Sequence, residues 1–217
     1  MQKIQLNKKE ENIKKLNQKE NEIKNINDTL TYEKNYKVTF KDTSKDILTI
    51  TLKDYEISFK LLGKEIKNKE KELNYKQAVQ VDALKLSYQN IMDNEDIEYE
   101  IMQDDNIIKE NIVIKENNKE SYQYEYEITT KNLEVKLNED ASKLLFVNNK
   151  DEIIYTMLPP EMKDSNNNKS DKISYEIEQE EDNKYNCKII ASKNWINDPN
   201  RKCPIYLDPS IQVNKQE

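Results

Sequence analysis

The sequence contains no histidine and only one glycine, Gly63. Without histidine, the chain can build neither a nucleophile activated by an imidazole nor a histidine-based metal site. One glycine is too few for a phosphate-binding P-loop or for the glycine-rich loop that binds dinucleotides. Arg201 is the only arginine, which excludes clusters of guanidinium groups that grip phosphates. These absences exclude most of the familiar enzyme classes, and no cofactor is predicted.

The chain is acidic and has a modest share of hydrophobic residues. Of the 217 residues, 35% are hydrophobic and 35% are charged, and the formal net charge is −7. Acidic residues interleave with the lysines, so no basic stripe forms and we predict no nucleic-acid partner. No apolar run approaches the roughly 18 residues of a membrane helix, so no membrane span is predicted. The lysine-rich N-terminus also lacks the apolar segment of a signal peptide.

The first 30 residues differ from the rest of the chain. Ile13, Leu16, Ile23 and Ile26 lie at helical spacings among polar residues and form a thin apolar stripe. Such a stripe buries too little area to offset the entropy of ordering the segment. Residues 1–30 are therefore predicted to be a polar extension, either a frayed helix or a disordered segment.

From about residue 32 onward, apolar and polar residues alternate. Tyr36, Val38 and Phe40 begin the series, and this period of two is typical of antiparallel strands with one dry and one wet face. About a dozen such runs, without helical patterns between them, predict an all-β antiparallel sandwich. We expect this sandwich to span residues 31–211, with a weak internal boundary near 64–74 and a tail over 212–217.

Asparagine and aspartate take the place of glycine in the predicted turns. They gather in residues 103–106, 148–151 and 163–169, each of which lies between two alternating runs. Both residue types tolerate a positive φ better than other non-glycine residues. These links are therefore predicted to be tight turns between strands.

Three tyrosines form a ladder along one predicted strand. Tyr122, Tyr124 and Tyr126 alternate with Gln123 and Glu125. The alternation favours a strand whose tyrosines face the core. A platform on which sugar rings stack is the alternative interpretation.

Residues 164–171 resemble the start of a calcium-binding loop. Oxygen-bearing side chains stand at positions one, three and five, and calcium prefers oxygen ligands. The sixth position holds Lys169 where such loops have glycine, and the twelfth holds Tyr175 where they have glutamate. A polar hairpin loop is therefore favoured, and calcium is the weaker alternative. Its candidate ligands are Asp164, Asn166, Asn168 and Asp171.

Two acidic clusters offer carboxylates for a hydrolase site. One comprises Asp93, Glu95 and Asp96, and the other Asp104 and Asp105. Glycoside hydrolysis needs two carboxyl groups about 5–9 Å apart in one groove. Acidic residues in turns are usually solvated, so this hydrolase is the least favoured function.

The two cysteines, Cys187 and Cys203, fall on the last two predicted strands. If these strands form a hairpin, the two sulfur atoms can face each other and form a disulfide. Two buried, reduced thiols are an equally good interpretation, and a secreted setting would favour the disulfide.

Several ordered segments resemble one bacterial family. Residues 157–164 (MLPPEMKD) and 195–209 (WINDPNRKCPIYLDP) look like the pattern P-P-x-M-x-D … W-L-x-D-P-x-R-x-x-P-V-x-I-D-P. Residues 86–91 (LSYQNI) with 96–99 (DIEY), and residues 108–114 (IKENIVI), resemble further segments of that family. The chain is thus similar to the β-rich module that precedes the repeats in Rhs/YD-repeat wall-associated proteins of Gram-positive bacteria.

This resemblance extends over roughly residues 23–211 and implies a role. Proteins of this polymorphic-toxin type, some of them associated with DNRLRE domains, are exported and serve contact-dependent competition between cells. The resemblance implies a non-catalytic structural or docking module located outside the cell or in the cell wall. Its partners would be other domains of the same polypeptide or cell-wall polysaccharide. The alternatives are a carbohydrate-binding module that uses Trp195, and a free-standing protein-binding β-sandwich.

The repeated aspartate–proline pairs suggest a structural motif. Proline keeps the preceding aspartate out of the α region, and the aspartate carboxylate can then accept nearby backbone N–H groups. Arg201 would suit a buried ion pair with one of these aspartates. The predicted motif comprises Trp195, Asp198, Pro199, Arg201, Pro204, Asp208 and Pro209.

Overall fold

A computed structural model describes residues 22–26, 29–41, 47–62, 65–66, 69–70, 79–92 and 94–214. It confirms the predicted all-β antiparallel fold, with more and shorter strands than the dozen expected. The strands are β1 (Lys24–Ile26), β2 (Thr29–Glu33), β3 (Lys37–Lys41), β4 (Leu48–Leu52), β5 (Tyr55–Leu62), β6 (Glu65–Ile66), β7 (Lys69–Glu70), β8 (Val79–Asp82), β9 (Lys85–Met92), β10 (Glu95–Met102), β11 (Ile107–Ile114), β12 (Tyr122–Lys131), β13 (Glu134–Leu137), β14 (Leu144–Val147), β15 (Ile153–Met157), β16 (Glu161–Lys163), β17 (Lys169–Ser170), β18 (Ile173–Glu181), β19 (Lys184–Ala191), β20 (Ile205–Asp208) and β21 (Ile211–Val213). One short helix, α2 (Lys193–Ile196), is also described.

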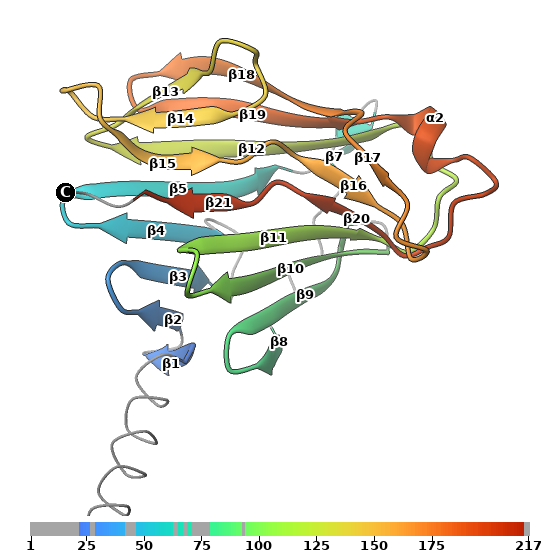
Figure 1. Cartoon of the computed structure of the whole chain (residues 1–217), viewed down its shortest axis with the longest axis horizontal. Helices are drawn as coiled ribbons and strands as arrows, with labels where there is room; N and C mark the ends of the chain where they lie inside the picture. The colour runs from blue at the N-terminus through green and yellow to red at the C-terminus, as the bar shows by residue number, and fades with distance from the viewer. Residues whose placement is uncertain are drawn as a thin grey trace, which may run out of the picture.

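Two large sheets form the layers of the sandwich (Figure 1). The first sheet has the order β1-β2-β3-β4-β5-β12-β19-β18. The second has the order β13-β14-β15-β21-β11-β10-β9-β8. A branch of this sheet starts at β11, which also pairs with β20; β20 pairs with β16, and β16 with β17. Strands β6 and β7 form a separate hairpin. All the strand pairs are antiparallel, in agreement with the alternating sequence pattern.

The core lies between the two sheets and follows the alternation of the sequence. In β12, the residues Tyr122, Tyr124, Tyr126 and Ile128 are each at most 2% exposed, while Gln123 faces solvent. Because β12 pairs with β5 on one side and β19 on the other, this tyrosine ladder lies at the centre of its sheet. The core-facing interpretation of the ladder is therefore confirmed, and the sugar platform is excluded.

Left-handed turn residues replace glycine, as expected. Asn106, Asp151 and Asn167 have φ values of 53°, 59° and 64°, one in each of the three predicted turns. Asparagine and aspartate adopt this region at low steric cost. Tight hairpins can therefore form almost without glycine.

The ends of the sandwich lie further out in the sequence than 31 and 211. The first sheet begins at β1, so residues 24–26 and 29–30 belong to strands, and β21 continues to Val213. Residues 1–21 and 27–28 of the predicted N-terminal extension lie outside the described residues. In the described segments, no helix is long and apolar enough to cross a membrane.

Candidate functional site

A pocket of about 410 Å³ lies at one end of the sandwich, where turns from both sheets meet. Its size is within the range of small-molecule sites. The lining combines four asparagines, three other polar residues and a small apolar floor. These residues are Asp54, Tyr55, Asn132, Leu133, Glu134, Val147, Asn148, Asn149 and Asn183.

The backbone of these turns fixes the shape of the pocket. Lys53, Asn132, Asp151 and Asn183 all have a positive φ, between 55° and 61°. Asn132 Nδ2 donates to the carbonyl oxygen of residue 54 at 2.9 Å, which ties two of the turns together.

Asn148 connects the two sheets at the pocket. This residue is 4% exposed, and its Nδ2 donates to the Tyr55 hydroxyl at 3.0 Å. Its Oδ1 accepts the backbone N–H groups of Lys150 and Glu152 at 2.9 and 3.0 Å. The hydrogen bonds of Asn148 therefore fix the turn after β14 against Tyr55 of the first sheet.

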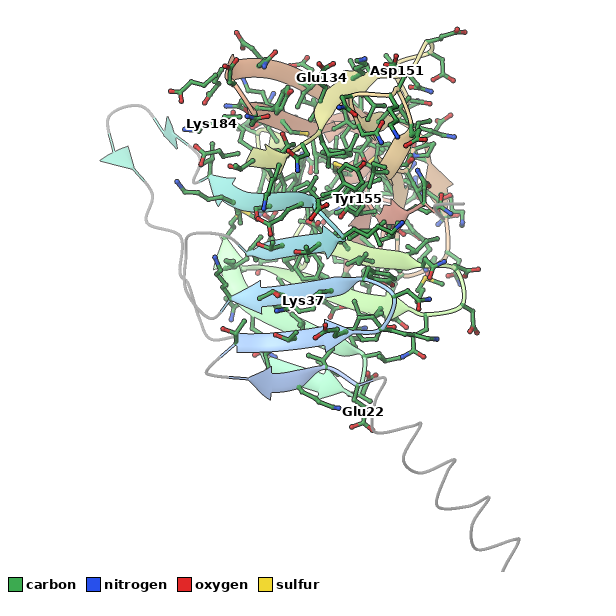
Figure 2. The ribbon with its side chains drawn as sticks, turned by 90° about the vertical axis from the view of Figure 1, so that its left-hand side faces the viewer. Glu22, Lys37, Glu134, Asp151, Tyr155 and Lys184 are labelled. Carbon is green, nitrogen blue, oxygen red and sulfur yellow. The ribbon has the colours of Figure 1, made fainter. Side chains whose placement is uncertain are left out.

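Glu134 of the lining shares a lysine with a second carboxylate, Asp151. Lys136 Nζ is 3.3 Å from Glu134 Oε2 and 3.2 Å from Asp151 Oδ1. Figure 2 shows Glu134 and Asp151 together at the same end of the molecule. Hydrogen bonds from Lys136 to Asp151 and then to Glu134 raise the pKa of the lysine. The pocket therefore offers hydrogen-bond acceptors, amide groups and a tyrosine hydroxyl to a polar ligand.

Three exposed lysines adjoin the pocket in the sequence. Lys53 and Lys131 each precede a residue of the lining, Lys150 follows one, and all three are exposed. They bring positive charge to the rim of a lining that itself contains two carboxylates. Sequence reasoning missed this pocket, because its residues come from four turns that are distant in the chain.

The residues of the predicted structural motif lie at another part of the molecule, around α2. Ser192 caps this helix, and its hydroxyl accepts the Trp195 backbone N–H at 3.4 Å. The Arg201 guanidinium lies 4.8 Å from the centre of the Trp195 ring. Trp195 is half-buried because it packs against the core, and the Arg201 guanidinium covers part of its ring.

The sequence suggested that Arg201 pairs with Asp198 or Asp208, but its ion-pair partner in the structure is Asp164. Arg201 Nη1 is 3.5 Å from Asp164 Oδ2. Asp164 is fully buried and also accepts the backbone N–H groups of Asn166 and Asn168, each at 2.9 Å. Burial raises the pKa of Asp164, but the hydrogen bonds from Asn168 and its neighbours outweigh this effect and lower it.

These contacts favour the hairpin interpretation of residues 164–171 over calcium. Asn168 Nδ2 also donates to Asp164 Oδ2 at 2.9 Å, so N–H donors surround this carboxylate. Asp171 is exposed at the other end of the loop. Among the described residues, no group of three histidine, cysteine, aspartate or glutamate residues is placed to hold a metal ion.

The two aspartate–proline pairs behave differently. Asp198 accepts the Asn200 backbone N–H at 2.8 Å, as the motif predicts, and this bond is the main cause of its lowered pKa. Asp208 instead accepts the Ser210 hydroxyl and lies 3.3 Å from Lys109 Nζ. Pro209 is buried and Pro199 exposed, while Pro204 follows a cis peptide bond.

The acidic clusters do not form a paired-carboxylate site. Glu95 and Asp96 begin β10, whereas Asp104 and Asp105 lie in the turn beyond its other end. Eight residues of extended strand separate the clusters by about 25 Å, which is far more than glycoside hydrolysis permits. Asp93 lies outside the described residues.

Two carboxylates are buried inside the sandwich. Glu95 is 2% exposed, and its Oε1 lies 2.5 Å from Lys119 Nζ and accepts the Tyr124 hydroxyl at 3.0 Å. Glu110 is 3% exposed and accepts the Tyr126 hydroxyl at 2.6 Å. Both acids stabilise the contact between the sheets and are inaccessible to a substrate.

The cysteines are free thiols, so the disulfide is not formed. Cys187 is buried in β19 of the first sheet, whereas Cys203 is half-buried in the loop before β20 of the second sheet. The expected hairpin does not exist, because the last strands belong to different layers. Burial, and then the nearby Glu110, raises the pKa of Cys187 to about 12.

Comparison with known proteins finds relatives among bacterial nucleases. The chain is 28% identical over 139 residues to the protein named "tRNA nuclease WapA" of Bacillus subtilis strain 168, a match that covers 61% of this chain and 6% of the relative. It is 26% identical over 174 residues to the "tRNA(Glu)-specific nuclease WapA" of Bacillus subtilis subsp. natto, covering 74% of this chain and 7% of the relative. No protein-family model matches the chain. No solved structure matches it either.

These relatives correct several expectations. They are named WapA tRNA nucleases and are not identified as the N-terminal module of Rhs/YD-repeat proteins. Their names also overturn the predicted non-enzymatic docking role and the predicted absence of a nucleic-acid partner, and they favour neither the glycan-binding nor the free-standing alternative. The prediction of a non-enzymatic protein failed because it was argued in part from residue types that are missing in this chain. The chain matches only 6–7% of each relative, so its composition says nothing about the rest of such a protein.

Proposed function

We propose that this chain is a β-rich region of a tRNA-cleaving toxin protein similar to WapA. The similarity to three proteins named as tRNA nucleases supports this function. Because the match covers 6–7% of the relatives, cleavage is proposed for the whole protein and is not assigned to residues of this chain. An extracellular or cell-wall location belongs to the same proposal.

The whole gene product tests this function. Incubated with total tRNA, it should cleave a subset of tRNAs and leave 5S ribosomal RNA intact, as read on denaturing gels. A matched protein lacking residues 23–213 shows what this region contributes. A full-length product that leaves every tRNA intact would contradict the proposal.

Within this chain, we place the contact with tRNA at the pocket between the turns. Asparagine amides pair with the edges of bases, and an aromatic ring can stack on an unpaired base. Asn149, Asn183 and Tyr55 supply these groups, and the rim lysines can meet the phosphates. These features support recognition of an unpaired nucleotide.

Charge removal at the rim tests this contact separately from cleavage. Replacing Lys53, Lys131 and Lys150 by glutamine should weaken binding of labelled tRNA to the chain and reduce its salt dependence. The matched control replaces Lys37, Lys172 and Lys202, which are equally exposed and lie outside the pocket lining. Equal binding by both triple variants would place the contact elsewhere.

A further inference from the structure

Strand β18 leaves one edge of the first sheet open. It is the last strand in the order of that sheet and pairs only with β19 among the described strands. Figure 1 shows it at the upper border of the sandwich. A nine-residue strand with an open edge is a template for pairing with another chain.

The hydrogen-bond pattern identifies which backbone groups are unpaired. The Ser192 N–H donates to the carbonyl oxygen of Lys172 at 2.9 Å, so residues 172 and 192 form a hydrogen-bonded pair. In an antiparallel ladder these pairs alternate, so the even-numbered residues of β18 bond to β19. The N–H and C=O groups of Tyr175 and Ile177 therefore point away from β19 at the open edge.

The side chains of β18 divide into an acidic and an apolar face. Ser174, Glu176 and Glu178 are exposed on the outer face of the sheet. Tyr175 is buried on the inner face and Ile177 is half-buried beside it. A strand added at this edge would meet glutamates on one face and the border of the core on the other.

We propose that the open edge of β18 binds an extended segment of a partner protein in which lysines alternate with apolar residues. Its lysines would lie beside Glu176 and Glu178, and its apolar residues would cover Ile177. Lys188 of β19 is already paired in register with Glu176, so this face accommodates lysine beside glutamate. This inference is independent of the proposed tRNA cleavage.

Charge argues against a second copy of this strand as the occupant. Two β18 strands paired antiparallel would place glutamates next to glutamates, and like charges on neighbouring strands are destabilising. Charged edges commonly protect a sheet from aggregation. Here Glu176 and Glu178 have one sign and lie on one face, so they disfavour an identical edge and favour a lysine-bearing one.

Peptide binding to the full chain tests the proposal. A labelled peptide of alternating lysine and valine should bind in fluorescence anisotropy, more weakly at high salt, and an alternating glutamate and valine peptide should not. On binding, hydrogen exchange should slow at the amides of Tyr175 and Ile177. Glu178→Lys should weaken binding about tenfold. Glu33→Lys, an equal charge change at the far side of the same sheet, should leave it unchanged.

A backbone variant separates edge pairing from simple charge attraction. Ile177→Pro removes one outward N–H and preserves the bonds to β19, since proline is tolerated at strand edges. Ile177→Ala loses the side chain but keeps the N–H. We expect Ile177→Pro to bind far more weakly than Ile177→Ala, with both variants folded by circular dichroism. Equal binding by the two, or absence of slowed exchange at residues 175 and 177, would overturn the proposal.

Discussion

The Tyr126 hydroxyl donates a 2.6 Å hydrogen bond to Glu110 Oε1 and so connects β12 of one sheet to β11 of the other. Burial is the main cause that raises the pKa of Glu110, to about 7, while hydrogen bonds from Tyr126 and Tyr99 act in the opposite direction. Asp208 and Cys187 are the nearby groups from β20 and β19. The contact between the two sheets therefore includes a carboxyl group that stays protonated well above its usual range.

This burial makes the stability of the sandwich depend on pH. In the unfolded chain Glu110 loses its proton near pH 4.5, but in the folded chain it does so near 7. Between these values only the folded state holds the proton, so the free energy of unfolding falls as pH rises. The loss is about 3 kcal/mol in total and levels off above pH 7.

Glu110→Gln should remove this pH dependence, because its amide keeps the shape and the tyrosine bond without an ionisable proton. Urea unfolding at intervals from pH 4 to pH 8 gives the difference between wild type and variant. Glu100→Gln, an exposed change on β10, is the control. Parallel curves for wild type and Glu110→Gln would contradict the prediction.

The buried pair of Glu95 and Lys119 gives a second prediction. Their side chains are 3% and 19% exposed, so Lys119→Met leaves an uncompensated carboxylate inside the protein. We expect a loss of about 3–5 kcal/mol in the free energy of unfolding. Adding Glu95→Gln should restore most of it, which urea denaturation of the single and double variants measures.

An exposed ion pair provides the comparison for Lys119. Lys169 and Glu161 lie 2.8 Å apart with side chains about half exposed. Lys169→Met should therefore cost at most about 1 kcal/mol. A similar loss for Lys169→Met and Lys119→Met would show that burial does not govern the Glu95 pair.

The alternation of the sequence was enough to predict the strands, and it also held an overlooked signal. Glu110 falls on the same face as Ile108 and Ile112, and Glu95 on the same face as Ile97. A carboxylate at an apolar position predicts a buried acid with a partner, but its partner comes from another strand. The pairing itself could not be predicted from local sequence.

The partner of Arg201 and the pocket were beyond local sequence for the same reason. Asp164 lies 37 residues before Arg201 and reaches it through the β16–β17 hairpin. The pocket lining combines turns as distant as Asp54 and Asn183. Such groupings depend on the order of strands in the two sheets, which alternation leaves undetermined.

Arg201→Lys should lower stability, because lysine retains the charge but loses the flat guanidinium over Trp195 and the Nη1 contact with Asp164. We expect a loss of about 1 kcal/mol, or about 2–4 °C in Tm for a chain of this size. Thermal unfolding followed by Trp195 fluorescence measures it. Lys202→Arg, an exposed neighbour, is the control. Equal Tm values for wild type and Arg201→Lys would refute this role.

The two thiols should differ sharply in reactivity. The thiolate is the reactive form, and burial holds Cys187 in the thiol state with a pKa of about 12. Cys203 is half-buried, and its pKa is raised first by burial and then by Glu116. Titration of the folded chain with a thiol reagent at pH 8 should therefore label Cys203 slowly and leave Cys187 unmodified until the protein is denatured.

Two serine variants show which cysteine of the folded chain reacts with the thiol reagent. Cys203→Ser should abolish labelling of the folded chain, whereas Cys187→Ser should label at the wild-type rate. Because Cys187 lies in the first sheet and Cys203 in the loop that leads into β20 of the second, mild oxidation should leave the intact mass free of an internal disulfide. Fast labelling of Cys187 in the folded Cys203→Ser variant would show that β19 opens to solvent, and an intramolecular disulfide would require a different arrangement of the last two strands.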